Sequence, residues 1–404
     1  MGMSPFKLVC AMGFFAIFSS TISKSPVLPL FADNLGAPAS QIGLVAAAST
    51  IAGILFSIPA GLLSDRFGRK SMLMASGVVF ASAPAMYLIT THIWQLAVVR
   101  FYHGLATAIF IPVAMAYVSD QHENTMGEKL GWFSTATLCG RFLAPLSGGA
   151  LLGLVGSNGS QTFHGVYLVC LIAGVVALAL SFRVQPQKVA QKVKGNRHAQ
   201  FDALKQLASS RRLLTIGAVE AAVLFMYGTI EIFLPLYALK QNLSTVQIGM
   251  FLSAQIITLA LTKPAMGKFS DQHERTPQII CGSALGIVAV LSLVFCTGFL
   301  SLLIVSILIG LSLSAVTSAT AAAVAEISRC ENRGSAMGIF GTIMDVGHSA
   351  GPLASGILVA SFGFKASFIA AALVIGLAMT VFIITEAFEK TTCPTDQHHT
   401  GETP

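Results

Sequence analysis

Charged residues are scarce in this chain. Only 10% of its 404 residues are Asp, Glu, Lys or Arg, whereas 54% are hydrophobic. The mean hydropathy is +0.76. A soluble domain carries about 25% charged residues, so this composition excludes an ordinary soluble protein. We therefore expect an integral membrane protein.

Sequence motifs of common catalytic sites are also missing. There is no Gly-rich phosphate-binding loop ending in G-K-[ST] and no cluster of side chains with metal-ligand spacing. The seven cysteines show no paired spacing, and most lie inside apolar runs, where we interpret them as packing residues. We expect neither an enzyme nor an ATP-driven pump, with no metal and no cofactor, so that a proton gradient would supply the energy.

Apolar runs recur twelve times along the chain. Each is about 20 residues or longer, which is enough to cross a bilayer as a helix. They cover residues 7–32, 41–63, 71–91, 94–119, 130–155, 163–183, 213–239, 245–269, 277–297, 299–327, 334–361 and 365–387. The sequence therefore predicts an all-α integral membrane protein with twelve transmembrane helices.

The basic residues orient these spans. The net charge of +7 does not indicate a nucleic-acid partner, because the basic residues lie between apolar runs rather than in one patch. If residue 1 is cytoplasmic, 18 of the 24 Lys and Arg residues lie in cytoplasmic segments or at the cytoplasmic ends of spans, four lie farther inside spans, and only Lys240 and Lys365 are external. We expect a multi-pass protein of a bacterial inner membrane with both termini cytoplasmic.

The first six spans are repeated as the last six. Leu28-Pro29-Leu30 recurs as Leu234-Pro235-Leu236, and Ser64-Asp65 recurs as Ser270-Asp271, both 206 residues later. Because six is an even number, the two copies cross the membrane in the same direction. We predict a six-helix bundle over residues 1–183, a basic cytoplasmic linker over 184–212, a second bundle over 213–388 and a disordered tail over 389–404.

A charged segment separates the second and third spans. Residues 61–71 read G-L-L-S-D-R-F-G-R-K-S and fill every specified position of G-x-L-x-D-R-x-G-R-[KR]. The segment, here called the first clasp, resembles the loop between helices 2 and 3 of the major facilitator superfamily. The resemblance extends over nearly the whole chain and implies two parallel-repeat bundles that rock about a midplane site. It also implies a gating role for Gly61, Asp65, Arg66, Gly68, Arg69 and Lys70.

The repeat carries a second clasp at Gly267–Arg275. It keeps Asp271 and Arg275 but loses the middle Gly and Arg, so the expected gating residues of this segment are Asp271 and Arg275. In the first clasp, we expect Arg69 to reach Asp120 or Glu123 at the end of the fourth span.

The fifth span fits G-x8-G-x3-G-P-x2-G-G, except that Ala144 replaces one Gly. It resembles the antiporter motif of the twelve-helix drug:proton antiporter families. Small residues allow helices to pack closely, and proline bends a helix. The functional interpretation is a tight seam between the halves that suppresses leak, and the alternative is ordinary close packing. The matching positions are Gly131, Gly140, Pro145, Gly148 and Gly149.

Titratable residues within spans are costly in a bilayer and are therefore functional candidates. Lys24 and Glu231 each lie eight residues before the external end of their span, the first and the seventh. If these helices line the cavity as in the family, the two residues face each other from opposite halves. They are candidates for proton coupling or substrate binding. The alternative is a fixed ion pair that closes one state.

Further acids and a histidine lie in the C-terminal half. Glu220 is about three helical turns before Glu231, on the same face, so it is either a second proton station or a partner that neutralises Lys263. Asp345 and His348 are neighbours on the eleventh span. A histidine beside a carboxylate suits a proton carrier, although a packing histidine is the alternative.

The N-terminal half contributes basic residues instead. Arg100 opens an R-x-x-x-G run that resembles the family's helix 4 motif, in which the Arg is associated with proton transfer or with bracing the cavity. Arg100, His103 and Arg141 are candidates for substrate binding. The candidate apolar contacts to substrate are Phe110, Met115, Phe225 and Met226, and the alternative is that these are lipid-facing or core residues.

These patterns favour a proton-coupled secondary transporter that exports small amphipathic or drug-like molecules. One alternative is a permease or exporter for a specific metabolite, such as an organic anion, because the first half is unusually basic. Another is a lipid flippase or a non-transporting receptor on the same fold. The expected partners are a small-molecule substrate, protons and membrane lipids, and we expect a monomer.

Overall fold

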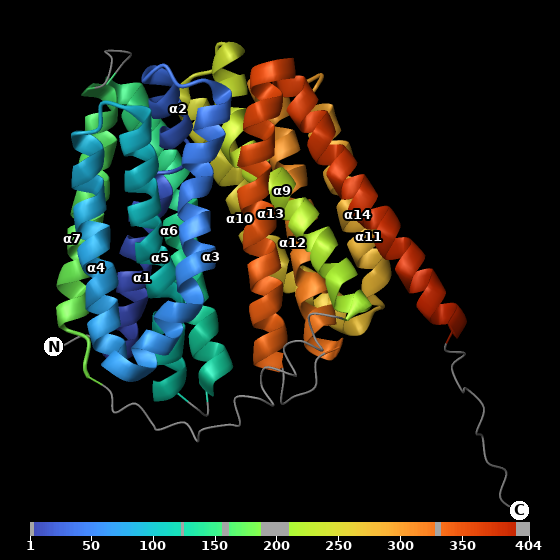
Figure 1. The fold of residues 1–404 in the computed structure, drawn as a ribbon, viewed down its shortest axis with the longest axis horizontal. Coiled ribbons are helices and arrows are strands. Elements are labelled where there is room, and N and C mark those ends of the chain that lie inside the picture. The colour runs from blue at the N-terminus through green and yellow to red at the C-terminus, as the bar shows by residue number, and fades with distance from the viewer. Residues whose placement is uncertain (1–3, 123–124, 156–160, 187–209, 328–332, 393–404) are drawn as a thin grey trace, which may run out of the picture.

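The computed structural model describes residues 4–122, 125–155, 161–186, 210–327 and 333–392. The regular structure of these residues is helical throughout. The helices form two halves that stand side by side, α1 to α7 and α9 to α14 (Figure 1). We call the end at which α1 begins the lower end, as drawn in Figure 1, and the opposite end the upper end.

The helices of the first half are α1 (Pro5–Ile22), α2 (Val27–Asn34), α3 (Ala39–Phe67), α4 (Arg69–Leu88), α5 (Ile93–Gln121), α6 (Met126–Val155) and α7 (Gln161–Phe182). Those of the second half are α9 (Arg211–Lys240), α10 (Thr245–Gln272), α11 (Arg275–Ser292), α12 (Phe299–Ile327), α13 (Arg333–Phe362) and α14 (Phe364–Thr392).

Eleven stretches of the described chain are long and apolar enough to cross a membrane, with α1 and α2 counted as one. The 30-residue helix α13 is not among them, because its glycines and serines and the polar Asp345 and His348 make it less apolar. With α13 as the remaining crossing, the helices follow the predicted twelve-span order.

The first span is not the continuous helix that the sequence predicted over residues 7–32. α1 ends at Ile22, α2 begins at Val27, and residues 23–26 form a turn. Pro26 has no backbone N–H and disfavours helical geometry at Ser25, so it stops α1. Lys24 therefore lies on the interruption of the span.

Two predicted boundaries differ from the helix ends. α9 begins at Arg211, so the last two residues of the predicted linker are helical. α14 continues to Thr392, beyond the predicted start of the tail. Residues 187–209 and 393–404, which make up most of the predicted linker and tail, lie outside the described residues.

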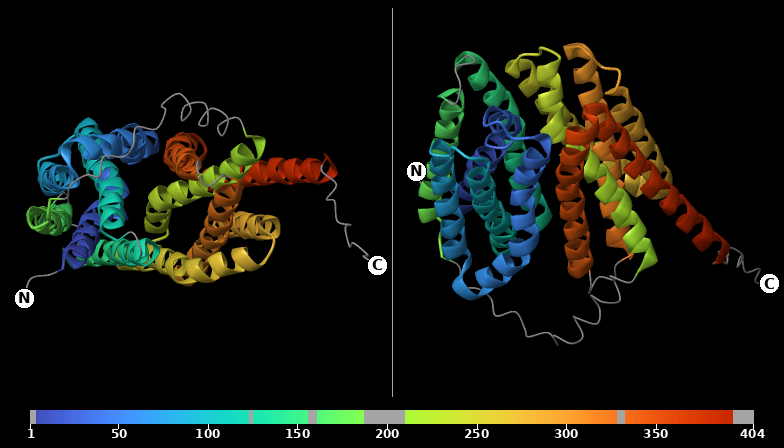
Figure 2. Two further views of the ribbon diagram at one scale, coloured as in Figure 1. Left: turned by 90° about the horizontal axis from the view of Figure 1, so that it is seen from below. Right: turned by 45° about the horizontal axis from the view of Figure 1, so that its top comes forward.

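Two glycine seams join the halves near the upper end. α3 lies against α13, and α6 lies against α10 (Figure 2, left). A Cβ on Gly356 would lie 2.7 Å from the Ala39 carbonyl oxygen, and one on Gly249 would lie 2.5 Å from that of Pro145. Larger side chains would hold these helices apart.

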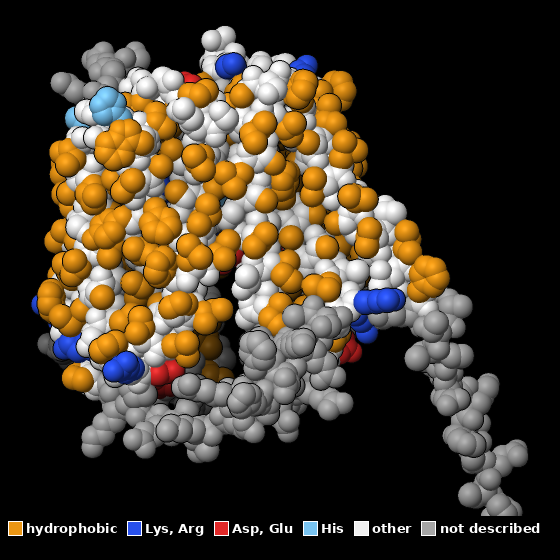
Figure 3. Space-filling view, in the orientation of Figure 1, with side chains coloured by type: hydrophobic (Ala, Val, Ile, Leu, Met, Phe, Trp, Pro, Cys, Tyr) orange, Lys and Arg blue, Asp and Glu red, His pale blue; other side chains and the backbone are white. Residues whose placement is uncertain are grey.

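The two seams are related by the internal sequence repeat. Gly43 and Gly356 approach each other at one seam, and their repeat counterparts Gly249 and Gly149 approach at the other. An apolar cluster adds to the closure, with Ile22, Val27 and Phe31 of one half packed with Ile232 and Phe233 of the other. Toward the lower end the molecule is hollowed between its halves (Figure 3).

Candidate transport site between the halves

An ion pair connects the two halves. Lys24 lies on the turn between α1 and α2, and Glu231 lies on α9. Lys24 Nζ is 2.6 Å from Glu231 Oε2, and the two side chains are only 15% and 9% exposed. These residues therefore face each other from opposite halves, and in this conformation they are paired.

A third side chain reaches the same carboxylate oxygen. His348 Nε2, from α13, is 3.1 Å from Glu231 Oε2, and the His348 ring lies 5.4 Å from that of Tyr227. The sequence analysis paired His348 with Asp345 instead. Packing of α13 on α9 turns His348 toward Glu231, and the Asp345 carboxylate has no hydrogen-bond or ion-pair partner in the described part of the chain.

The shared oxygen ties the charge of Glu231 to the contact between halves. An ionised carboxylate only accepts hydrogen bonds, so it can accept from both Lys24 and the Nε2–H tautomer of His348. A proton on Glu231 removes the charge that attracts Lys24. The arrangement can therefore convert protonation of one side chain into a change in contact between the halves.

Arg141 faces the space beside this pair. It lies in the middle of α6 with an exposed side chain, and its charge acts on Lys24, Tyr227 and Lys263, which belong to three other segments. No carboxylate pairs with Arg141 among the described residues. Its cation is thus available to an anionic group between the halves.

Arg100 is buried within the first half, with 2% of its surface exposed. Its Nη2 donates to Ser49 Oγ at 2.7 Å, and its Nη1 makes longer contacts of 3.4 Å with Ser23 and Tyr87. These partners are hydroxyl groups, and within the described ranges no carboxylate neutralises Arg100. Arg100 braces α5 against α3, α4 and the turn that carries Lys24.

His103 lies beside Arg100 and is 1% exposed. Its Nδ1 is 3.4 Å from Ser23 Oγ and 3.5 Å from the Tyr87 hydroxyl, and its Nε2 has no hydrogen-bond partner in the part of the chain that the structure describes. Gly104 allows the close packing at this point, because a Cβ there would lie 2.6 Å from the Ser49 carbonyl oxygen. In this conformation His103 is a buried packing residue next to the candidate site.

Glu220 is fully buried on α9, and its Oε2 lies 2.7 Å from the hydroxyl oxygen of Thr320 on α12. The alternative in which Glu220 neutralises Lys263 stays a prediction. Lys263 acts on Glu220 electrostatically, but the described residues show no ion pair between them. Thr320 gave no signal in the sequence, because a threonine within an apolar span is common.

The first clasp is an ion-pair network at the lower end. Arg69 is 5% exposed and lies 2.6 Å from Asp65 Oδ1, and its Nε donates to Asp120 Oδ2 at 3.1 Å. Ser64 Oγ accepts a further hydrogen bond from Arg69. The expected contact with Asp120 is present, and Glu123 lies outside the described residues. Gly68 has a φ of +87°, which explains the glycine between α3 and α4.

The second clasp pairs differently. Arg275 forms an ion pair with Glu326, while Ser270 Oγ and Arg275 Nε have no hydrogen-bond partner among the residues that the structure describes. Glu326 was missed by the sequence analysis, although it lies 206 residues after Asp120 and so occupies its repeat position. The repeat offset was the signal that could have found it.

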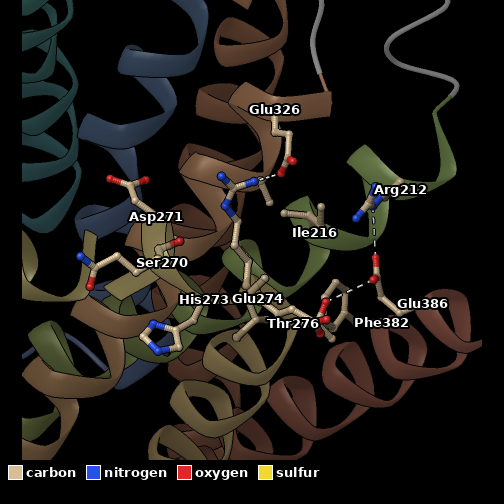
Figure 4. A pocket seen from close by; sticks show the side chains of 14 residues that line it. Arg212, Ile216, Ser270, Asp271, His273, Glu274, Thr276, Glu326, Phe382 and Glu386 are labelled. Carbon is tan, nitrogen blue, oxygen red and sulfur yellow. Dashed lines mark hydrogen bonds and ion pairs between the residues drawn. The ribbon is translucent and has the colours of Figure 1, made fainter. Parts of the chain in front are cut away.

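A cavity of about 490 Å³ lies beside the second clasp (Figure 4). Ser270, Asp271 and Glu326 line one side of it. On another side Glu386 accepts from Arg212 at 3.2 Å and from Thr276 at 3.2 Å. The cavity belongs to the lower end of the second half and does not include Lys24 or Glu231.

The antiporter-motif glycines separate into three environments. Gly149 lies at the α6–α10 seam, as the functional interpretation expected. Gly140 and Gly148 pack instead on α1 and α2 within their own half, and Gly131 faces open space. Pro145 contributes its carbonyl oxygen to the seam beside Gly249. Only part of the motif therefore lies between the halves.

The four apolar residues predicted to contact substrate also lie in different environments. Phe110 packs with Phe80 and Phe133 in the core of the first half, and Met226 is buried in the core of the second. Neither can touch a substrate between the halves in this conformation, because both are fully buried. Phe225 is half-buried, and Met115 is 41% exposed.

Comparison with known proteins decides the family. The model of the Major Facilitator Superfamily matches residues 9–257 and 221–400. The chain belongs to the major facilitator superfamily. It is 27% identical to an uncharacterised MFS-type transporter of Methanocaldococcus jannaschii, over 84% of this chain and 87% of that protein. It is 28% identical to the multidrug resistance protein MdtG of Yersinia enterocolitica, over 87% and 85% of the two chains.

Solved transporter structures share the fold. A bacterial homolog of the human lysosomal transporter Spinster, inward-facing and occupied, superposes with a TM-score of 0.81 at 14% identity, over 99% of this chain and 100% of that one. The nucleoside transporter NupG, as its D323A mutant, gives a TM-score of 0.81 at 13% identity, over 94% and 99%. The chain is thus a multi-pass membrane transporter of this superfamily.

Proposed function

We propose that this transporter exports small amphipathic molecules in exchange for protons, with its lower end in the cytoplasm. The observation that carries the proposal is the contact of Lys24 and His348 with one carboxylate oxygen of Glu231. The basic residues predicted to be cytoplasmic support the orientation, and both chain termini would then lie in the cytoplasm of a bacterial cell. The similarity to MdtG proteins supports a drug-like substrate.

The mechanism follows from the geometry. With the seams closed and the lower end open, the ionised Glu231 holds Lys24 and His348, and a substrate enters from the lower end. When the halves rock and the upper end opens, the Lys24–Glu231 contact breaks and Glu231 can take a proton from outside. The substrate leaves on that side. Loss of the proton on return restores the ion pair and the closed seams.

Proton flux in proteoliposomes with an internal pH dye tests this proposal. Lipophilic cations, neutral drugs and organic anions are added in turn to wild type and to Glu231→Gln. We expect substrate-evoked proton movement in wild type that is lost in Glu231→Gln. Asp33→Asn is the matched control, because Asp33 is an exposed acid at the upper end of α2 and should leave the flux unchanged.

Exchange of an organic anion is the second candidate. It is favoured by Arg141 and Arg100, which bring two cations near Lys24 without a carboxylate partner in the described part of the molecule. If wild type moves no protons while labelled organic anions equilibrate, the antiport proposal fails and this candidate replaces it.

A further inference from the structure

We propose that Glu220 is protonated in the conformation seen here and is the residue that releases the coupled proton at the lower end. This inference rests on the proton coupling of the proposed function and names the residue that holds the proton. Glu231 is then the acid that takes the proton between the halves, and Glu220 is the acid within the second half that holds this proton before its release.

The hydrogen bonds around Thr320 carry the argument. Thr320 Oγ1 lies 2.7 Å from Glu220 Oε2 and 2.8 Å from the carbonyl oxygen of Val316. A carbonyl or carboxylate oxygen only accepts hydrogen bonds, and a Thr hydroxyl has one hydrogen. An ionised Glu220 would leave these two short contacts to share that hydrogen. A protonated Glu220 satisfies both, because it donates to Thr320 and Thr320 donates to Val316.

The surroundings of Glu220 agree with a neutral acid. The residue is 0% exposed, and its Oε1 has no hydrogen-bond partner within the described ranges. A buried carboxylate without a paired cation is costly, whereas a neutral carboxyl is much less so. Lys263 of α10 is the one charged group that acts on Glu220 in the described part of the chain, and it lies beyond ion-pair distance. Asp345 and His348, on the packed helix α13, do not act on it.

The position of Glu220 suits proton release. It is the tenth residue of α9 counted from the lower end, and Glu231 is the twenty-first, so Glu220 lies about 16 Å closer to that end. On release, the O–H bond of Glu220 breaks and the proton passes to water at the lower end. The carboxylate left behind is neutralised by approach of the Lys263 ammonium. Thr320 is then the positioning residue that holds the acid in its protonated form.

Infrared spectroscopy of the purified protein in lipid nanodiscs tests the protonation state without any substrate. We expect wild type at neutral pH to show the C=O stretch of a buried carboxylic acid. That band should vanish in Glu220→Gln and persist in Glu231→Gln. Thr320→Val keeps the acid but removes its hydrogen-bond partner, so the band should remain and move to higher frequency. A band that Glu220→Gln leaves unchanged, or its absence in wild type, overturns the proposal.

A transport assay distinguishes failure of this proposal from failure of the proposed function. In proteoliposomes we expect ethidium to evoke proton movement in wild type but not in Glu220→Gln, which should still bind ethidium. If wild type and Glu220→Gln move protons equally, Glu220 is not the proton carrier, but the proposal of antiport is still supported. If wild type moves none with any compound of the panel, antiport itself fails and the release step with it, while the infrared band still decides the protonation of Glu220.

Discussion

Gly249→Ala should prevent the upper end from closing. The added Cβ would lie 2.5 Å from the Pro145 carbonyl oxygen and 3.3 Å from Gly149 Cα. Both are backbone atoms, which cannot rotate away as a side chain can. The helices α6 and α10 must therefore part by roughly 1 Å to restore an ordinary contact distance.

The size of the effect follows from the cost of overpacking. Extra carbon atoms in a tightly packed region cost about 1–3 kcal/mol. The cost falls only on the state in which the seam is closed, because the helices separate when the upper end opens. Since about 1.4 kcal/mol corresponds to a factor of ten, the closed population should fall about 5- to 150-fold relative to the open one.

Distances between two spin labels measure this equilibrium. Labels replace Asn34 on α2 and Ser361 on α13, both exposed near the upper end, in a background without cysteines. We expect wild type in nanodiscs to give mainly the short distance and Gly249→Ala mainly a longer one. Gly53→Ala is the control, because a Cβ on Gly53 meets nothing within 4 Å.

The second seam provides a check. Gly356→Ala should shift the distances in the same direction, because its Cβ would lie 2.7 Å from the Ala39 carbonyl oxygen. If Gly249→Ala and Gly356→Ala both keep the wild-type distances and transport rate, close glycine packing does not control the closed state, and the reasoning from the seams is refuted.

Three further variants test the packing and the ion pairs. Phe110→Ala should lower the stability by about 3–5 kcal/mol, seen as a lower melting temperature, because its buried ring leaves a cavity; an unchanged melting temperature would contradict the core assignment. Arg69→Lys should lower the melting temperature, because lysine lacks the planar guanidinium group that contacts two acids at once. Arg66 is exposed, so Arg66→Lys should leave the melting temperature unchanged. Lys24→Met should destabilise the closed state by about 3–5 kcal/mol by leaving Glu231 without its lysine, and adding Glu231→Gln should restore much of that loss.

Much of the fold could be predicted from the sequence, because membrane spans, the clasp and the repeat are local or periodic patterns. The arginine network of the first clasp was predictable for the same reason, since Arg69 begins α4 and Asp120 lies near the end of α5, at the same side of the membrane. The repeat also predicts the position of Glu326, which pairs with the arginine of the second clasp as Asp120 pairs with that of the first.

The partners of the buried titratable groups could not be predicted in this way. His348 lies next to Asp345 on one helix, and only the packing of α13 on α9 selects Glu231 as its partner. Thr320 is 100 residues from Glu220 in the sequence, and no periodic pattern links them. The break after Ile22 could be predicted only in part. The proline that causes it is visible in the sequence, but prolines also occur inside the helices α3, α5 and α6 without ending them.

The Lys24–Glu231 pair and the glycine seams should act on one equilibrium, which makes closure of the upper end depend on pH. A falling pH protonates Glu231, and the neutral side chain no longer attracts Lys24. The population of molecules with an open upper end should therefore rise as the pH falls. Glu231→Gln mimics the protonated side chain. With the same spin labels, it should therefore shift toward the longer distance at every pH and lose most of the pH response. If the wild-type distances do not change with pH, or if Glu231→Gln keeps the full response, the carboxylate of Glu231 is not the group that couples protons to closure.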